Sequence, residues 1–239
     1  MSKQLYIDGQ AVSFEEGQTL MDAALAAGIY IPHLCHNPEF TPYGNCRLCT
    51  VKVNGRHAAA CVTPAQADAR VESNTGELNQ QRQLLLQMLF VEGNHQCPAC
   101  EKSGACQLQA VAYYCGMLAP ALSHFYPRHS MDASHPDMVI DFNRCILCAL
   151  CVRASEQVDG KQVFSISGRG RDTHLRVNSA TGKLADTDFS ANDRAAHVCP
   201  TGAILHKHKG YEVPIGKRFY DQRPVSQVGD ITSRGSDDN

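Results

Sequence analysis

The chain has 239 residues, 43% of them hydrophobic and 19% charged, and its formal net charge is −2 at pH 7. The length allows one or two domains, and the near-neutral charge lacks the clustered basic face that a nucleic-acid-binding protein requires. No apolar run approaches the roughly 18 residues of a membrane span, and residues 1–6 contain neither an apolar leader segment nor a twin-arginine signal. The sequence therefore predicts a mature cytoplasmic protein without a membrane span or a nucleic-acid partner.

Residues 1–75 are predicted to form a small unit of strands and one helix. Apolar and polar residues alternate on both sides of Asp8-Gly9, which predicts a β-hairpin. A short helix capped by Thr19 follows, and a second hairpin is predicted over residues 50–60. The order hairpin, helix, hairpin is that of the β-grasp fold found in plant-type ferredoxins. This similarity concerns the fold alone.

The rest of the chain divides by composition and periodicity into a helical region over 76–120, a linker over 121–136, a third unit over 137–205 and a tail over 206–239. Helices are expected over 77–91 and 107–118, and strands over 163–166 and 175–177. The last residues, 233–239, are polar and are expected to be disordered. The predicted fold class is therefore α+β.

Twelve cysteines are the most informative feature of the composition. In a cytosolic chain such a density indicates metal or redox chemistry, because the reducing environment keeps thiols free. Cys-x-x-Cys pairs begin at residues 46, 97, 145 and 148. Metal sites use this short spacing to direct two thiolates at one centre, and disulfide frameworks have no need of it.

The first ligand set has the spacing C-x10-C-x2-C-x11-C and consists of Cys35, Cys46, Cys49 and Cys61. One short pair and two distant cysteines supply the four thiolates of a [2Fe–2S] cluster when a loop wraps around it. The alternative is a zinc site, although zinc sites more often use two short pairs.

The second set contains three close cysteines and a nearby histidine: His95, Cys97, Cys100 and Cys106. A [4Fe–4S] cluster needs a fourth ligand, and imidazole replaces thiolate in other iron–sulfur centres. A neutral ligand removes negative charge from the cluster and should raise its reduction potential. The alternative is that His95 donates a hydrogen bond near the cluster or is an ordinary loop histidine.

The third set begins as a bacterial ferredoxin motif and consists of Cys145, Cys148, Cys151 and the distant Cys199, which precedes a proline. A two-cluster ferredoxin would need a second triplet, but residues 188–198 contain no cysteine. The set therefore predicts one [4Fe–4S] cluster. Cys115 is left over and is expected to be a packed side chain of a helix.

No catalytic residues are predicted. The chain has no dinucleotide-binding Gly-x-Gly-x-x-Gly after a strand and no Walker A motif. The cysteines outside the three sets cannot form a [NiFe] centre. The chain is therefore expected to carry electrons between partners that bind the donor and the acceptor.

The chain resembles the N-terminal iron–sulfur region of the complex I large subunit, of [FeFe] hydrogenases and of NAD-dependent formate dehydrogenases. It is most similar to the diaphorase iron–sulfur subunits of cytoplasmic NAD-reducing [NiFe] hydrogenases. The resemblance extends from Leu5 to about Tyr220, with these anchors: IPHLC (31–35), EGNH (92–95), CEKSG (100–104) and VCPTG (198–202). It departs from the wider family in the spacing of the ligand histidine, because only Gln96 separates His95 from Cys97, and in having one cluster in the third unit.

The resemblance implies a β-grasp [2Fe–2S] domain, a helical domain with His/Cys ligation of a [4Fe–4S] cluster, and a ferredoxin-like domain with one [4Fe–4S] cluster. It also implies reversible reduction of NAD+ by H2. The implied partners are a flavin- and NAD-binding diaphorase subunit and the small and large subunits of a [NiFe] hydrogenase. Two alternatives remain open: a relay in another NAD-linked dehydrogenase, such as formate dehydrogenase or a complex I-like enzyme, and a zinc-stabilised scaffold.

Overall fold

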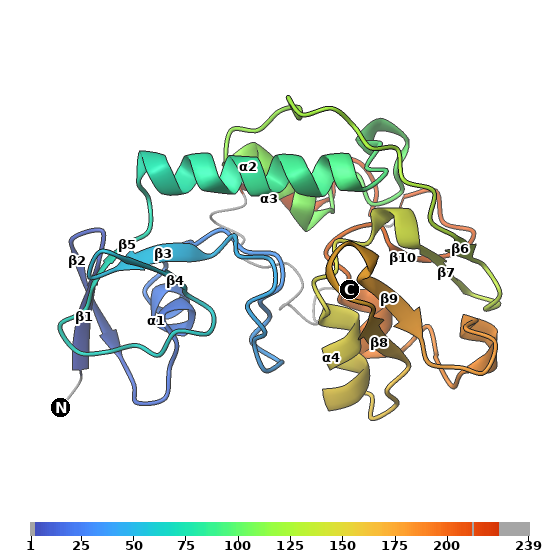
Figure 1. Ribbon diagram of the computed structural model, residues 1–239, viewed down its shortest axis with the longest axis horizontal. Coiled ribbons are helices and arrows are strands. Elements are labelled where there is room, and N and C mark those ends of the chain that lie inside the picture. Colours follow the sequence, from blue (N-terminus) through green and yellow to red (C-terminus); the bar gives the residue numbers. More distant parts are fainter. Residues whose placement is uncertain (1–2, 212, 225–239) are drawn as a thin grey trace.

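The computed structural model describes residues 3–211 and 213–224, in which two β-rich regions are bridged by a pair of helices (Figure 1). The N-terminal region is a five-stranded mixed sheet with strand order β2-β1-β5-β3-β4. Its strands are β1 (Lys3–Ile7), β2 (Gln10–Phe14), β3 (Thr50–Val53), β4 (Arg56–Ala59) and β5 (Arg70–Glu72). Strand β1 runs antiparallel to β2 and parallel to β5.

Both predicted hairpins are present, and their turns explain their register. The pairs Asp8-Gly9 and Asn54-Gly55 all have positive φ, between 48° and 85°. Two consecutive residues of positive φ give a two-residue turn whose twist matches that of the flanking strands. The apolar side chains that alternate along β1 and β2 are buried in one core with helix α1 (Leu20–Ala26).

Helix α1 begins where the sequence predicts. Its N-cap Thr19 accepts a hydrogen bond from the Asp22 amide at 3.2 Å, and the Asp22 carboxylate accepts from the Thr19 amide at 2.9 Å. This reciprocal capping box satisfies two amides that have no partner within the helix. Gly28, with φ of +71°, follows the end of the helix.

Two helices connect the β-rich regions. Helix α2 (Gly76–Glu92) has 17 residues, a length of about 25 Å. It runs from above the first sheet toward the C-terminal region (Figure 1). Helix α3 (Gln107–Tyr114) packs against it through a core that includes Leu86, Leu108 and Val111. Helix α3 ends four residues earlier than expected, because Gly116 adopts a positive φ of 73° that turns the chain away.

The C-terminal region combines a three-stranded sheet, a hairpin and short helices. The sheet has the order β10-β7-β6, with β6 (Met131–Asp132), β7 (Met138–Asp141) and β10 (Ile204–His206). The hairpin pairs β8 (Phe164–Ser167) with β9 (His174–Val177), close to the two predicted strands. The helices are α4 (Leu150–Gln157), α5 (Arg194–His197) and α6 (Phe219–Gln222), and the 3-10 turns are η1 (Cys97–Ala99), η2 (Phe142–Arg144), η3 (Gly170–Asp172) and η4 (Leu184–Asp186).

Two short strands were not expected from the sequence. The segment predicted as a linker contains β6, which pairs with β7, and the predicted tail begins inside β10, where His206 pairs with Met138. Strands of two or three residues leave no periodicity for sequence analysis to detect. The predicted disorder of residues 233–239 lies outside the described residues.

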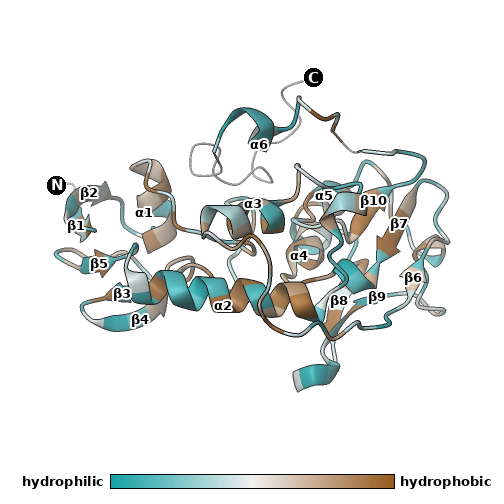
Figure 2. Ribbon diagram, turned by 90° about the horizontal axis from the view of Figure 1, so that it is seen from above, coloured by the Kyte–Doolittle hydropathy of each residue, from teal (hydrophilic) through white to brown (hydrophobic). Residues whose placement is uncertain are grey.

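The two β-rich regions share a core. Cys35 and Phe40, from the loop that follows α1, are buried in one cluster with the apolar face of α4 and the strands β7 and β8. Apolar residues of β7 and β10 belong to the same cluster, and both strands carry hydrophobic colouring in Figure 2. Within the described part of the chain, no helix is both long and apolar enough to cross a membrane.

Candidate iron–sulfur centres

The structure brings the four cysteines of the first set together: Cys35, Cys46 and Cys49 lie in the loop between α1 and β3, and Cys61 follows β4. Cys49 Sγ lies 3.4 Å from Cys61 Sγ, and the Cys46 amide donates a hydrogen bond to Cys35 Sγ at 3.3 Å. Three of the four side chains are buried, and Cys46 is half-buried. Arg47, with φ of 57°, lets the backbone curl around the sulfur atoms.

The sulfur atoms of the first set perturb one another. Hydrogen bonds from Cys46 and then Cys61 lower the pKa of Cys35 to about 2, and the positive charge of Arg153 acts in the same direction. A hydrogen bond from Cys61 lowers the pKa of Cys49 to about 7. The pKa values of the other two thiols are raised, chiefly by hydrogen bonding to Cys35. The four thiols are therefore neighbours in one site.

The second set lines one cavity, together with Phe90, Leu108 and Arg144. Burial raises the pKa of Cys106 to about 12, so this thiol needs a positive centre to ionise. Burial, and then the charge of Arg144, lower the pKa of His95 to about 4, which keeps its imidazole neutral at pH 7. His95 Nε2 is buried and has no hydrogen-bond partner among the described residues. A buried nitrogen with a free lone pair beside three thiols fits the fourth ligand position of a cluster.

Gly93 makes room for this histidine. A Cβ atom at residue 93 would lie 2.5 Å from His95 Nε2 and 3.0 Å from the Asn143 carbonyl oxygen. The φ of Gly93 is −111°, which any residue adopts, so the close approach alone requires glycine. Sequence analysis included Gly93 in the EGNH anchor, but its contact with the imidazole is visible only in three dimensions.

The third set lines a second cavity, with Ile166 and Leu175 on its walls. The two cavities are of similar size, each with a volume of about 20 Å³. Burial raises the pKa of Cys145 to about 11, and the pKa values of Cys148 and Cys151 are also raised by burial. Backbone amides, including that of Leu147 toward Cys145, oppose this effect by donating to sulfur. Such a pocket favours thiolates only when iron is bound.

The turn at residues 199–202 contacts both the second and the third sets. Cys199 belongs to the third set, and the carbonyl oxygen of Pro200 accepts a hydrogen bond from Cys106 Sγ at 3.6 Å. A Cβ atom on Gly202 would lie 3.1 Å from Cys100 Sγ. The two [4Fe–4S] sites are therefore close neighbours, separated by this turn.

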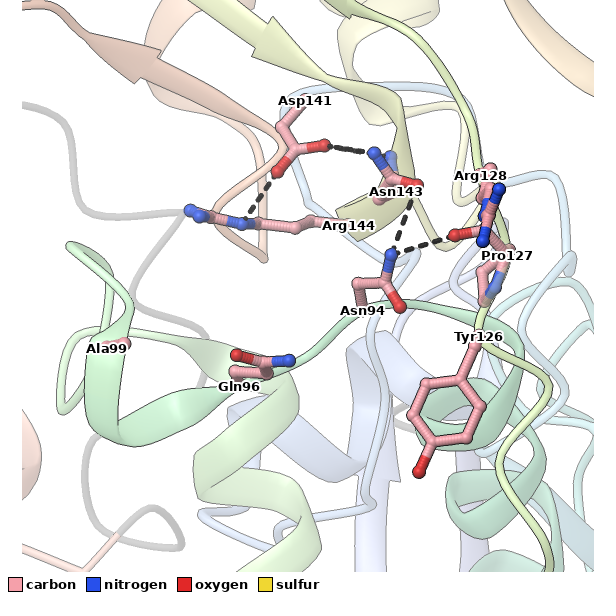
Figure 3. Close-up of a pocket in the computed structure, with 9 residues that line it drawn as sticks. All are labelled: Asn94, Gln96, Ala99, Tyr126, Pro127, Arg128, Asp141, Asn143 and Arg144. Atoms are coloured by element: carbon pink, nitrogen blue, oxygen red, sulfur yellow. Dashed lines mark hydrogen bonds and ion pairs between the residues drawn. The ribbon is translucent and has the colours of Figure 1, made fainter.

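Arg144 lies at the same boundary and was missed by sequence analysis. Its guanidinium donates to Cys100 Sγ at 3.6 Å and forms ion pairs with Glu101 at 2.7 Å and with Asp141 at 2.9 Å. Figure 3 shows a neighbouring pocket, in which Asp141 forms an ion pair with Arg144 and Asn94 donates a hydrogen bond to Asn143. The sequence signal that could have identified Arg144 is its position directly before Cys145, the first cysteine of the third set.

Cys115 lies apart from all three sites. It follows the last residue of α3, and burial raises the pKa of its thiol to about 11. Its carbonyl oxygen accepts a hydrogen bond from Gln83 at 2.7 Å. All twelve cysteines are free of disulfides.

Three family models match consecutive parts of the chain. Residues 3–76 match a 2Fe-2S iron-sulfur cluster binding domain, residues 82–120 match the NADH-ubiquinone oxidoreductase-G iron-sulfur binding region, and residues 138–205 match a 4Fe-4S single cluster domain. The chain therefore carries one [2Fe–2S] cluster and two [4Fe–4S] clusters.

Similar proteins fall into two groups by length. The chain is 40% identical to the NAD-reducing hydrogenase HoxS subunit gamma of Cupriavidus necator, over 94% of this chain and 96% of that protein. It is 32% identical to the NADPH-Fe(3+) oxidoreductase subunit alpha of Geobacter sulfurreducens, of which it covers only 24%. It also covers 27% of the NADH-ubiquinone oxidoreductase 78 kDa subunit of Neurospora crassa, at 30% identity.

A solved structure of an NAD+-reducing [NiFe]-hydrogenase in the H2-reduced state contains a similar chain. The match has a TM-score of 0.93 and 51% sequence identity, and it covers 98% of this chain and 99% of the other.

Proposed function

Because this chain belongs to the family of NAD-reducing hydrogenase gamma subunits, we propose that it relays electrons between a [NiFe] hydrogenase module and a flavin-containing diaphorase subunit that reduces NAD+. The overall reaction of the complex is H2 + NAD+ to NADH + H+, and it is reversible. The observation that carries the proposal is the match along nearly the whole of both chains to a hydrogenase subunit. The chain itself is an electron-transfer subunit and contributes no substrate site.

We assign the ligands according to the three gathered sets. The [2Fe–2S] cluster is held by Cys35, Cys46, Cys49 and Cys61. The two [4Fe–4S] clusters are held by His95, Cys97, Cys100 and Cys106, and by Cys145, Cys148, Cys151 and Cys199. The unpartnered, buried Nε2 of His95 supports its place in the second site. Each cluster supplies one-electron redox chemistry, and the chain positions the clusters and shields them from water.

The third site lies between the other two. Cys35 shares a buried core with Cys148 and Cys151, and Cys106 contacts the turn that carries Cys199. We therefore place the third cluster in the middle of the relay, with the [2Fe–2S] cluster and the His/Cys cluster toward the two ends.

The domain layout is part of the proposal. We divide the chain into a β-grasp domain over 1–75, a helical domain over 76–120, a linker over 121–136, a ferredoxin-like domain over 137–205 and a tail over 206–239. The ranges of the three family models support these divisions. We place the protein in the cytoplasm, because a reducing compartment keeps thiols available for iron.

The test is purification of the native complex under anaerobic conditions, with identification of its subunits and measurement of NAD+ reduction by H2 and by formate. We expect hydrogenase and diaphorase subunits, H2-dependent activity, and about ten irons per chain, two from the [2Fe–2S] cluster and four from each [4Fe–4S] cluster. Formate-dependent activity with a formate dehydrogenase subunit would support the second candidate, a relay in another NAD-linked dehydrogenase. That candidate is favoured by the matches to complex I subunits. A colourless protein that contains zinc would exclude both relays.

A further inference from the structure

Arg153 is a fully buried cation without an acidic partner. Its side chain, on helix α4, has 0% exposure, the lowest of any arginine described. Within the described part of the chain, no carboxylate forms an ion pair with it. Arginine is rarely buried in this way, because an unpaired charge in a low-dielectric interior costs several kcal/mol. Something else in the native protein must compensate for this charge.

The guanidinium donates hydrogen bonds to four backbone carbonyl oxygens, and two of them belong to proposed cluster ligands. Nη2 donates to the Cys35 carbonyl oxygen at 2.6 Å and to the Cys148 carbonyl oxygen at 3.3 Å. Nη1 donates to the Thr41 carbonyl oxygen at 2.9 Å, and Nε donates to the Ala149 carbonyl oxygen at 3.2 Å. The charge thus lies between a ligand of the first site and a ligand of the third.

Carbonyl dipoles orient the guanidinium but do not neutralise it. A [2Fe–2S] or [4Fe–4S] cluster held by four thiolates is anionic, and it becomes more so when it is reduced. A cation fixed in the same dry interior interacts strongly with both charges. Clusters held at the first and third sites would supply the missing counter-charge of Arg153.

We propose that Arg153 is a positioning residue that serves as the shared counter-charge of the first and third clusters, raising the reduction potentials of both and holding the Cys35 loop against α4. The inference rests on the proposed function. Its sign follows from charge alone: the cation stabilises the reduced form of each cluster more than the oxidised form. The second cluster has a different arginine, Arg144, whose charge is balanced by Glu101 and Asp141.

A substitution at Tyr43 can test the charge while Arg153 remains in place. The Tyr43 ring lies 4.9 Å from Arg153 Cζ, and its side chain is 47% exposed, so that a polar replacement is accommodated. Tyr43→Glu places a carboxylate beside the guanidinium, and Tyr43→Gln is the uncharged control of similar size. In the full chain with its clusters, we expect EPR-monitored redox titration to give more negative midpoint potentials for the first and third clusters in Tyr43→Glu than in Tyr43→Gln.

Direct substitution gives the larger effect. In Arg153→Met we expect the reduced-to-oxidised ratio of both clusters to fall at least tenfold at a fixed ambient potential, a shift of about 59 mV for a one-electron couple. Arg153→Lys keeps the charge and should leave both potentials near those of the wild type. If Arg153→Met does not assemble its clusters, the two Tyr43 variants still decide the matter.

Arg194→Gln is the structural control. Arg194 also joins the two β-rich regions, through an ion pair with Glu39 at 2.7 Å, but its charge is already balanced. The Arg194→Gln substitution should therefore leave the midpoint potentials of the first and third clusters unchanged. Equal midpoints in the two Tyr43 variants, or an equal shift of the second cluster, would overturn the inference. Absence of [2Fe–2S] and [4Fe–4S] signals from the wild-type chain would instead refute the proposed function.

Discussion

At position 93 the absence of a side chain determines where an imidazole lies. A Cβ atom there would approach His95 Nε2 to 2.5 Å, well inside van der Waals contact. We therefore expect Gly93→Ala to displace the ring and to remove at least half of the EPR signal of the second cluster, while the other two clusters are retained.

The control for this substitution lies at the other end of the same helix. Gly76 is the first residue of α2, and a Cβ atom added there would meet only open space, with no positive φ to strain it. Gly76→Ala should preserve all three signals and change the free energy of unfolding by no more than about 1 kcal/mol. An unaltered second cluster in Gly93→Ala would mean that His95 is not a ligand.

Cys115 and Cys199 allow a second comparison between single residues. Cys199 lines the cavity of the third set, whereas Cys115 lines the cavity of neither the second nor the third set and follows the end of α3. We expect Cys115→Ser to keep about ten irons per chain, since three sites are complete without it. Cys199→Ser should selectively weaken the third cluster, measured by iron content and EPR. A cluster signal lost in the Cys115 variant would show that the ligand count is wrong.

Local spacing in the sequence predicted which cysteines lie together. It did not predict contacts between residues that are far apart along the chain. A Cys-x-x-Cys pair can be recognised from four consecutive residues of the sequence. The structure brings each set together around one loop or cavity. The contact between Arg153 and Cys35 joins residues 118 positions apart. No periodicity or motif reports such a contact, and a buried arginine on a short helix looks the same in sequence as an exposed one.

At the scale of elements, the cluster loops contrast with the hairpins beside them. Strands β1 and β2 are paired along their full length, and their apolar side chains are buried. The loops that carry the first and third sets contain non-glycine residues with positive φ, such as Arg47, Leu147 and Ala149. Each such backbone conformation costs of order 1–3 kcal/mol, so it persists only where surrounding interactions offset that cost.

We therefore expect removal of iron to disorder the loops 35–49, 93–106 and 145–151 selectively. Metal binding supplies the free energy that offsets both the backbone strain and the ionisation of buried thiols. Hydrogen exchange of the chelator-treated chain under reducing, anaerobic conditions should show rapid exchange in these loops and continued protection in β1 and β2. Native-like protection of the loops without iron would contradict this expectation.

The predicted elements were most accurate where they were long or had a specific turn. Asp8-Gly9 and Asn54-Gly55 specify tight hairpins, and α2 is long enough to show its boundaries. Strands β6 and β10, of two and three residues, form only because β7 lies between them. Their stability depends on tertiary contacts, which is why the local sequence pattern does not predict these two strands.

At the scale of the whole molecule, the C-terminal tail returns to the second site. Arg218 donates to the Ser103 carbonyl oxygen at 2.8 Å, and its guanidinium lies over Gly104, where no side chain would fit. In Figure 2, α6 lies on the same side as α3 and α5. Tyr211 and Ile215 remain 47% and 66% exposed, and exposed apolar side chains of this kind are typical of protein interfaces.

Truncation after Lys209 tests whether this tail docks with a partner. The cut must follow His206, because β10 is part of the C-terminal sheet. We expect the truncated chain to keep its iron but to assemble several-fold more weakly with its partners, with H2-dependent NAD+ reduction falling in proportion. Arg218→Ala separates the internal contact from docking, since it leaves the exposed apolar side chains in place. If the truncated chain assembles and turns over like the full chain, the docking surface lies on the cluster domains.

The turn at residues 199–202 has a consequence for kinetics. It begins at Cys199, a proposed ligand of the third cluster, and the carbonyl oxygen of its second residue, Pro200, lies 3.6 Å from Sγ of Cys106, a proposed ligand of the second. A tunnelling electron would therefore have an almost wholly covalent path between the two proposed [4Fe–4S] sites, interrupted by this one contact. No water molecule and no domain movement is required for that passage. The rate of exchange between these two centres should accordingly be independent of solvent viscosity, and diffusion will limit only the steps at the ends of the relay.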